Sequence, residues 1–351
     1  MNALHPKLLI KPVSRPERIE EIYQDMLVTE GMPAGTAFSV ALPRGWVLEE
    51  RQSVPTPGPV NPLVELASFR PATDGLFGSD VGAELVVWAV FLPREMHGRD
   101  WLRAWMTSQN YEPLDSREAH TLFGIMGDVL AMRRRDGITW LHRLTTIKDA
   151  DLLFLLDGRA HFPPGEDRMD IQEVFLMAVI RFRLLQATKQ LLAEGFDTVI
   201  LKGSSSIRFK VSGLWRQRPG GDAPAGGASL IFDNLLDQTA VGTMIAVLGM
   251  TGESSQELEA VTLRKLNSLG ITFTARTDPQ YEDETLGRNV VVRSVAALRD
   301  GAALTVVSAR IILGAIPASL ILISPSGSEA FEVWSVNLRA FDIALDSMEN
   351  I

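Results

Sequence analysis

The chain of 351 residues contains no cysteine. Disulfide bonds, thiolate metal sites and cysteine nucleophiles are therefore excluded, and we expect no lipoprotein anchor. Histidine is also scarce, with five residues that all lie in the first half of the chain and lack metal-ligand spacing such as HExxH. The sequence accordingly predicts no metal site and no bound cofactor.

No apolar run is long enough to cross a bilayer. The longest, residues 311–323, is interrupted by Pro317 and falls short of the roughly 20 residues that a membrane-spanning helix needs. The first ten residues lack the basic flank and the apolar core of a secretory signal. We therefore expect a cytoplasmic protein without stable membrane insertion.

Positive charge is in deficit, since the formal net charge is −9. Nucleic-acid binding is dominated by phosphate neutralisation, so this balance argues against a nucleic-acid partner. The one basic cluster is Arg133-Arg134-Arg135. It is typical of a solvated hairpin tip, because alternation along a strand puts only some of these side chains on one face. The alternative is a docking point for an acidic partner.

Catalytic motifs are missing as well. The glycine-rich stretch at residues 220–227 lacks the Lys-Ser/Thr of a phosphate-binding loop, which favours a plain loop. Glu118 and His120, with Asp115 nearby, could form an acid/base pair, but we expect that segment to be a loop, and no nucleophile or oxyanion donor accompanies it. We predict no catalytic residues, although a serine nucleophile with partners distant in the sequence stays open.

A series of apolar segments occurs twice in the chain. The two series open at residues 38–46 and 207–215, each with alternating apolar residues, a turn residue and a tryptophan, as in a half-buried strand that runs into a turn. Further strands, a helix, a hairpin, another strand and a closing helix follow in each. Such internal repetition predicts two copies of one structural unit.

The hairpin is the closest match between the two series. Arg135-Asp136-Gly137 and Arg299-Asp300-Gly301 each separate two alternating runs. Asp-Gly favours a type I′ turn, which needs positive φ at both central residues. The sequence therefore predicts an equivalent tight hairpin in each half.

The predicted architecture is α+β, with two tandem domains that each consist of a roughly six-stranded, mainly antiparallel sheet packed with helices. A hydrophobic content of 46% is sufficient for two cores. The expected boundaries are an N-terminal extension with a short helix (1–35), a first repeat (36–194), a connector (195–206) and a second repeat (207–351).

Tryptophans and arginines supply the candidate partner-binding residues. Trp101 and Trp105 are four apart on a predicted helix and therefore share a face. Most tryptophans at such positions pack in a core, and the alternative is a partly exposed aromatic groove, because tryptophan is enriched at interface hot spots. The candidates are Trp46, Trp101, Trp105, Arg133, Arg134 and Arg135.

The phrase that ends in Pro43-Arg44-Gly45-Trp46 is similar to the opening of many bacterial members of the PsbP-like superfamily, and the order of segments resembles it too. That superfamily includes the DcrB proteins and the Eag-type effector chaperones of type VI secretion. The second series departs from this opening, because Ser212-Gly213-Leu214-Trp215 has no proline. The resemblance implies antiparallel sheets flanked by helices and a protein that binds other proteins rather than an enzyme.

Together these features predict a non-catalytic cytoplasmic protein-binding module, a chaperone or adaptor for a secreted effector. The expected partner is a protein that offers an apolar helix, and the chain is expected to be a monomer or a homodimer. Two alternatives remain open at this point. One is a small-molecule or lipid-binding protein with a pocket between sheet and helix, and the less favoured one is a hydrolase.

Overall fold

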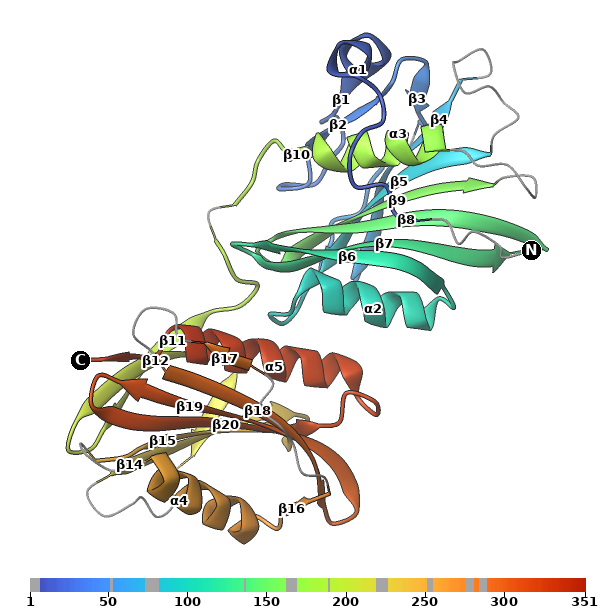
Figure 1. Ribbon diagram of the computed structural model, residues 1–351. Coiled ribbons are helices and arrows are strands. Elements are labelled where there is room, and N and C mark those ends of the chain that lie inside the picture. Colours follow the sequence, from blue (N-terminus) through green and yellow to red (C-terminus); the bar gives the residue numbers. More distant parts are fainter. Residues whose placement is uncertain are drawn as a thin grey trace. The chain divides into compact units, whose positions relative to one another are not determined.

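The computed structural model describes residues 7–50, 53–72, 82–135, 137–161, 169–188, 190–218, 227–250, 255–274, 281–283 and 289–351. The chain divides into two compact units, unit 1 (Met1–Ala193) and unit 2 (Glu194–Ile351). Each unit is an antiparallel sheet with helices on its faces (Figure 1). None of the described helices is both long enough and apolar enough to cross a membrane.

Unit 1 has a main sheet of seven described strands, all paired antiparallel. In spatial order these are β3 (Trp46–Leu48), β4 (Leu63–Pro71), β5 (Ala83–Phe91), β9 (Leu152–His161), β8 (Ile138–Asp149), β7 (Gly124–Arg135) and β6 (Glu112–Thr121). A smaller sheet contains β1 (Tyr23–Val28), β2 (Phe38–Pro43) and β10 (Arg183–Leu184). The short helix α1 (Pro16–Ile22) precedes β1 and begins with a proline, whose fixed φ suits the first helical position.

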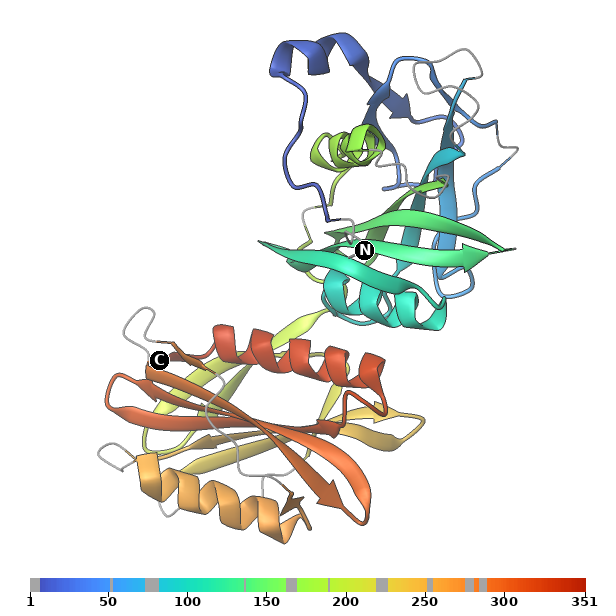
Figure 2. The same ribbon diagram turned by 45° about the vertical axis from the view of Figure 1, so that its right-hand side comes forward.

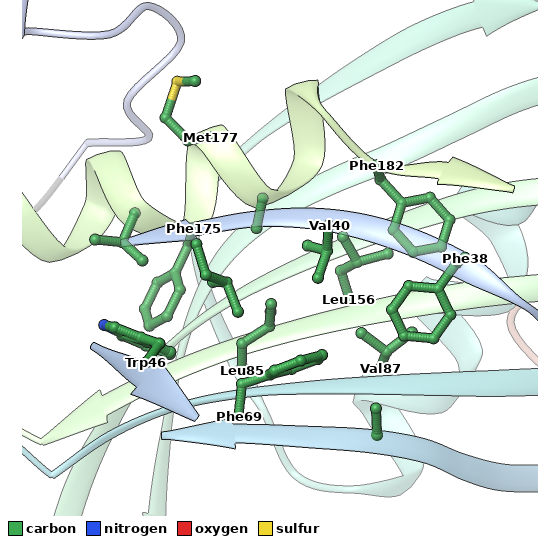
Figure 3. Packing of buried hydrophobic residues seen from close by; sticks show 14 of the residues in the cluster. Phe38, Val40, Trp46, Phe69, Leu85, Val87, Leu156, Phe175, Met177 and Phe182 are labelled. Carbon is green, nitrogen blue, oxygen red and sulfur yellow. The ribbon is translucent and has the colours of Figure 1, made fainter. Parts of the chain in front are cut away.

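The two faces of this sheet carry different layers. Helix α3 (Met169–Ile180) and the smaller sheet cover one face, where aromatic residues such as Phe38, Phe175 and Phe182 form the core (Figure 3). The closest approach of this layer is at Gly158 of β9, where an added Cβ would lie 2.3 Å from Phe175. Helix α2 (Gly98–Ser108) packs on β7 and β8 from the opposite face.

Unit 2 repeats this arrangement with different residues. In spatial order the strands of its main sheet are β13 (Trp215–Arg218), β14 (Ala228–Leu236), β15 (Thr239–Leu248), β20 (Ile316–Pro325), β19 (Ala302–Leu313), β18 (Asn289–Arg299) and β16 (Thr272–Phe273), with β17 (Tyr281–Asp283) also on β18. A smaller sheet contains β11 (Phe196–Lys202), β12 (Ser206–Ser212) and β21 (Glu349–Asn350). Helices α4 (Ser255–Ser268) and α5 (Phe331–Asp346) lie on opposite faces of the main sheet (Figure 2).

The two main sheets therefore have the same strand order, with one helix inserted after the third strand and another after the last. The smaller sheets match as well. In each, a central strand (β2 or β12) pairs with the strand that precedes it (β1 or β11) and with a short strand that follows the closing helix (β10 or β21). In the second hairpin Asp300 and Gly301 have φ of 52° and 83°, as a type I′ turn requires. Gly137 of the first hairpin has φ of 79°, and Asp136 lies outside the described residues.

The predicted α+β class with mainly antiparallel sheets is confirmed. Seven described strands lie in order along each main sheet, close to the roughly six expected. Residues 195–206 were expected to be a connector, but most of them form β11, which pairs with β12 along seven residues. Its exposed and buried residues do not alternate regularly, so the apolar pattern of a strand is missing there. In the same way, the expected N-terminal extension contributes β1 to the smaller sheet of unit 1.

Candidate functional site

Helix α2 carries the predicted aromatic pair on the flank of its buried face. Leu102 and Met106 point into the sheet and are almost fully buried. Trp101 and Trp105 lie beside them and are half-buried, so part of each ring faces solvent. The two indole rings stack with their centroids 5.8 Å apart and an interplanar angle of 16°, as the four-residue spacing predicted.

The aromatic contacts continue from α2 onto the sheet. Trp105 packs against Tyr111 with centroids 5.2 Å apart, and the guanidinium of Arg133 lies 5.1 Å from the centre of the Tyr111 ring. An arginine over a ring face gains cation–π attraction of about 0.5–1 kcal/mol at an exposed site. We call Trp101, Trp105, Tyr111 and Arg133 the aromatic surface.

Tyr111 is held neutral by its surroundings. Burial raises the pKa of its hydroxyl to about 12, and the negative charge of Asp157 adds to this effect, while Arg133 opposes it. Behind Tyr111 the ring of His142 packs edge-on at 4.9 Å, and Nδ1 of His142 lies 2.8 Å from Oδ1 of Asp157. The aromatic surface therefore stands on a buried hydrogen-bonded pair that fixes the orientation of its central ring.

Two glycines allow α2 to lie close to the sheet. A Cβ on Gly98 would come within 2.9 Å of Thr146 Oγ1, and a Cβ on Gly127 would come within 3.2 Å of the Cα of Arg99. This close approach buries Leu102 and leaves no room for larger side chains between helix and strand. The positions of Trp101 and Trp105 are consequently fixed by backbone packing.

The three predicted arginines do not form one patch. Arg133 turns toward α2, where it contacts Tyr111 and Gln109, and it is half-buried. Arg134 and Arg135 are exposed near the hairpin tip, and alternation along β7 puts Arg134 on the opposite face from its two neighbours. Only Arg133 therefore belongs to the aromatic surface by direct contact.

Trp46 lies elsewhere. Only 3% of its surface is exposed, and it packs in the core between β3 and α3. Its Nε1 has no hydrogen-bond partner among the described residues. In this conformation Trp46 cannot contact a partner, and its role fits the core interpretation of the tryptophans.

The acid/base candidates do not converge on one site. The segment expected to be a loop is strand β6, an edge strand whose side chains are mostly exposed and whose polar sequence hides the strand pattern. Glu118 pairs with Arg99 at 2.9 Å, Asp115 accepts the backbone N–H of Leu8, and His120 is exposed. No group of three or more potential metal ligands occurs in the described part of the chain.

Sequence reasoning missed the buried ionic groups of unit 1. Arg143 and Asp128 pair at 2.7 Å, and Lys148 and Glu95 pair through both carboxylate oxygens, with their side chains 1% exposed. Two adjacent polar residues in the middle of β8, His142 and Arg143, were the available signal. The sequence alone does not show that these side chains are buried, because their burial depends on the layers that cover the two faces of the sheet.

The N-terminal segment was also missed. Residues 7–15 lie against the rest of unit 1. Side chains of Asp115, Glu173 and Arg143 form hydrogen bonds to the backbone of this segment. The carboxylate of Glu173 accepts hydrogen bonds from the backbone N–H groups of Val13 and Ser14, both at 2.7 Å, and from the Ser14 hydroxyl at 2.8 Å. Arg143 donates to the carbonyl of Leu9 at 2.8 Å. We call residues 7–15 the N-terminal strap.

Comparison with known proteins places the chain in no established family. No protein-family model matches it, and no curated protein matches it. Among solved structures, it is similar to the type VI secretion immunity protein TplEi of Pseudomonas aeruginosa in complex with the "L" peptide, at 10% identity over 89% of this chain and 94% of that chain, with a TM-score of 0.21. The Tle4–Tli4 complex gives 11% identity over 93% and 97%, also with a TM-score of 0.21. TM-scores this low do not establish a common fold, so these likenesses carry no argument about the present chain.

Proposed function

We propose that this protein is a non-catalytic protein-binding module, and that unit 1 docks its partner through the aromatic surface. The observation that carries the proposal is the stacked, half-exposed pair of Trp101 and Trp105 beside Tyr111 and Arg133. Tryptophan, tyrosine and arginine are enriched at interface hot spots, and the two aromatic types offer large contact areas on few rotatable bonds.

The charge around this surface favours an acidic partner. Arg133 belongs to this surface, and the exposed Arg135 lies on the same face of β7 two residues further along. The chain as a whole carries a net charge of −9, so these arginines form a local exception. Such a patch attracts a segment that combines carboxylates with apolar side chains.

The partner class comes from the sequence. The PsbP-like resemblance includes Eag-type chaperones, and on that basis the partner is a secreted effector that presents an apolar helix, with this chain acting as its chaperone or adaptor. PsbP-like identity of the two halves, cytoplasmic location and a monomeric or homodimeric state belong to the same proposal. Size-exclusion chromatography with light scattering measures the last of these.

Photo-crosslinking in the native host tests the docking face. A photoreactive amino acid is placed at the exposed Ser108, which lies on the same flank of α2 as Trp101 and Trp105, and in a separate protein at the exposed Ser268 of α4 as the control. Counted from the left-handed residues after each helix, Asn110 and Gly270, these two positions are equivalent. We expect one protein with an acidic, apolar segment to crosslink at position 108 and not at position 268.

Two further variants make the result decisive. Trp101→Ala combined with Trp105→Ala removes the stacked pair, and Val261→Ala combined with Lys265→Ala makes the corresponding change on α4. The crosslink at position 108 is expected to disappear in the first variant and to persist in the second. Crosslinks of equal yield in both, or at both probe positions, would contradict docking through unit 1.

A further inference from the structure

The helix–sheet layer of unit 2 corresponds position by position to that of unit 1. Aligning the hairpin glycines Gly137 and Gly301 shows which strand residues of the two units correspond. Aligning Asn110 and Gly270, the left-handed residues that follow the helices, does the same for α2 and α4. The pairings agree with this register, because Thr146 faces Leu155 in unit 1 and the corresponding Arg310 faces Ser319 in unit 2. Residues at equal offsets from these points can therefore be compared directly.

Unit 1 fills this layer with hydrocarbon and unit 2 does not. Three leucines of unit 1 are 0–1% exposed, and unit 2 has a hydroxyl side chain at each corresponding position: Leu102 and Thr262, Leu144 and Ser308, Leu155 and Ser319. Each replacement removes buried apolar volume, which destabilises a core by roughly 2–5 kcal/mol for a truncated leucine. Three such residues around one point indicate a function other than packing.

The glycines that bring α2 close to the sheet are absent from unit 2. Gly98 corresponds to Leu258 and Gly127 to Val291, so side chains occupy the space that the close approach needs. Helix α4 packs mainly on β20, whereas α2 packs on β7 and β8. Strands β18 and β19 are therefore packed less closely by α4 than β7 and β8 are by α2.

A cavity of about 180 Å³ lies in this place. Apolar side chains from α4, β16 and the sheet make most of its wall, including Leu266, Phe273, Val295 and Val306. The polar end is formed by Glu259, which accepts hydrogen bonds from Arg293 at 3.0 Å and from Arg310 at 2.8 Å. These three side chains are 25–35% exposed, so the polar end meets solvent.

Two buried donors on the cavity wall have no hydrogen-bond partner among the described residues. They are Oγ1 of Thr262, a residue that is only 7% exposed, and Nε of Arg293. An unsatisfied buried polar group costs about 1–3 kcal/mol. Both can donate, so the group that completes the site must accept hydrogen bonds. Two arginines against one glutamate leave an excess positive charge, which favours an anionic acceptor.

We propose that this cavity binds a small monocarboxylate that carries one aromatic ring or a short branched alkyl group. The carboxylate lies at Arg293, Arg310 and Thr262, where arginine can bind it in bidentate fashion. The apolar group packs against the apolar wall of the cavity, which includes Leu266, Phe273, Val295 and Val306. A cavity of about 150 Å³ accommodates benzene, so the volume here suits a single ring.

Titration of the full chain with phenylacetate tests the proposal, with phenylacetamide as the neutral probe of the same shape. We expect saturable binding of phenylacetate by isothermal calorimetry or protein NMR, with shifts confined to the elements that line the cavity, α4, β16, β18, β19 and β20. Phenylacetamide should bind at least about tenfold more weakly, since it loses the charge-assisted hydrogen bonds. Equal binding of both probes, or no saturable binding of phenylacetate, would overturn the proposal.

Two variants locate the binding. The triple substitution Thr262→Leu, Ser308→Leu, Ser319→Leu restores the filled layer of unit 1, and we expect a higher melting temperature together with loss of phenylacetate binding. Arg310→Met keeps the volume, and should weaken phenylacetate at least about tenfold while leaving phenylacetamide unchanged. If either folded variant binds phenylacetate as tightly as the wild type does, the ligand lies elsewhere. Trp101→Ala with Trp105→Ala changes only the surface of unit 1 and should leave this binding unaltered.

Discussion

Charged residues are buried within the sheet of unit 1, and one of them, Glu84, accepts hydrogen bonds from three other side chains. Ser68 donates to one of its carboxylate oxygens at 2.6 Å and Arg159 donates to the other at 2.7 Å. Burial alone would raise the pKa of Glu84, but these hydrogen bonds and the charges of Arg159 and Arg70 hold the pKa below its ordinary value of 4.5. The ionised carboxylate therefore stabilises the fold.

This pKa sets a pH dependence. Because the folded pKa is lower than the unfolded one, the stabilisation is present above the unfolded pKa and is lost as the pH falls through the folded value. We expect Glu84→Gln to lower the free energy of unfolding at neutral pH, and the difference from wild type to shrink as the solution is acidified below pH 4.5. Urea denaturation at several pH values measures both quantities.

The exposed Glu20 provides the control for this experiment. It pairs with Arg181 at the surface, with 69% of its side chain exposed, so Glu20→Gln should change stability by no more than about 1 kcal/mol. A Glu84→Gln protein that matched the control at neutral pH would show that the Glu84 network does not stabilise the fold.

At the scale of elements, the N-terminal strap depends on one side chain of α3. Both oxygens of the Glu173 carboxylate bind the strap, through three hydrogen bonds at Val13 and Ser14. Charge-assisted bonds of this kind contribute roughly 1.5–3 kcal/mol each. The strap should detach locally when this carboxylate is removed, while the sheet below stays folded.

Hydrogen exchange tests the strap. In Glu173→Ala the amides of Val13 and Ser14 should exchange at least about tenfold faster, because their acceptor is gone. The amides of β9 should keep their protection. Unchanged exchange at Val13 and Ser14 would mean that other contacts hold the strap, and loss of protection throughout unit 1 would mean that Glu173 supports the core instead.

Elements with strong local signals could be predicted from sequence, and edge elements could not. The Asp-Gly hairpins and α2 were expected where they occur, because turn chemistry and the spacing of Leu102 and Met106 are encoded locally. Strands β6 and β11 were missed, since neither alternates between buried and exposed residues. Of the aromatic surface, the tryptophan pair was foreseen, whereas its contact with Tyr111 depends on tertiary packing.

The cavity of unit 2 shows a different limit of sequence reading. Thr262, Ser308 and Ser319 are unremarkable one at a time and lie on three different elements. Their common position follows only from the sheet register and from comparison with Leu102 and its neighbours in unit 1. The repeated topology is thus the feature that makes the polar residues informative.

For the whole molecule, the packing predicts two independently stable units. Each of the four buried apolar clusters draws its residues from one unit alone. We expect residues 1–193 and residues 194–351, produced separately, to fold and to unfold cooperatively. Circular dichroism and amide NMR spectra of the two halves check this, and a half without dispersed resonances would contradict it.

The two units combine a shared topology with unequal surfaces, and the central claim is that unit 1 binds the partner. The most direct test is the affinity of the crosslinked partner, measured by calorimetry for the full chain and for the two paired variants. Each hot-spot tryptophan contributes about 2 kcal/mol, so Trp101→Ala with Trp105→Ala should weaken binding about 1,000-fold. Val261→Ala with Lys265→Ala should change it by less than about twofold. Equal affinities of the two variants would contradict the claim.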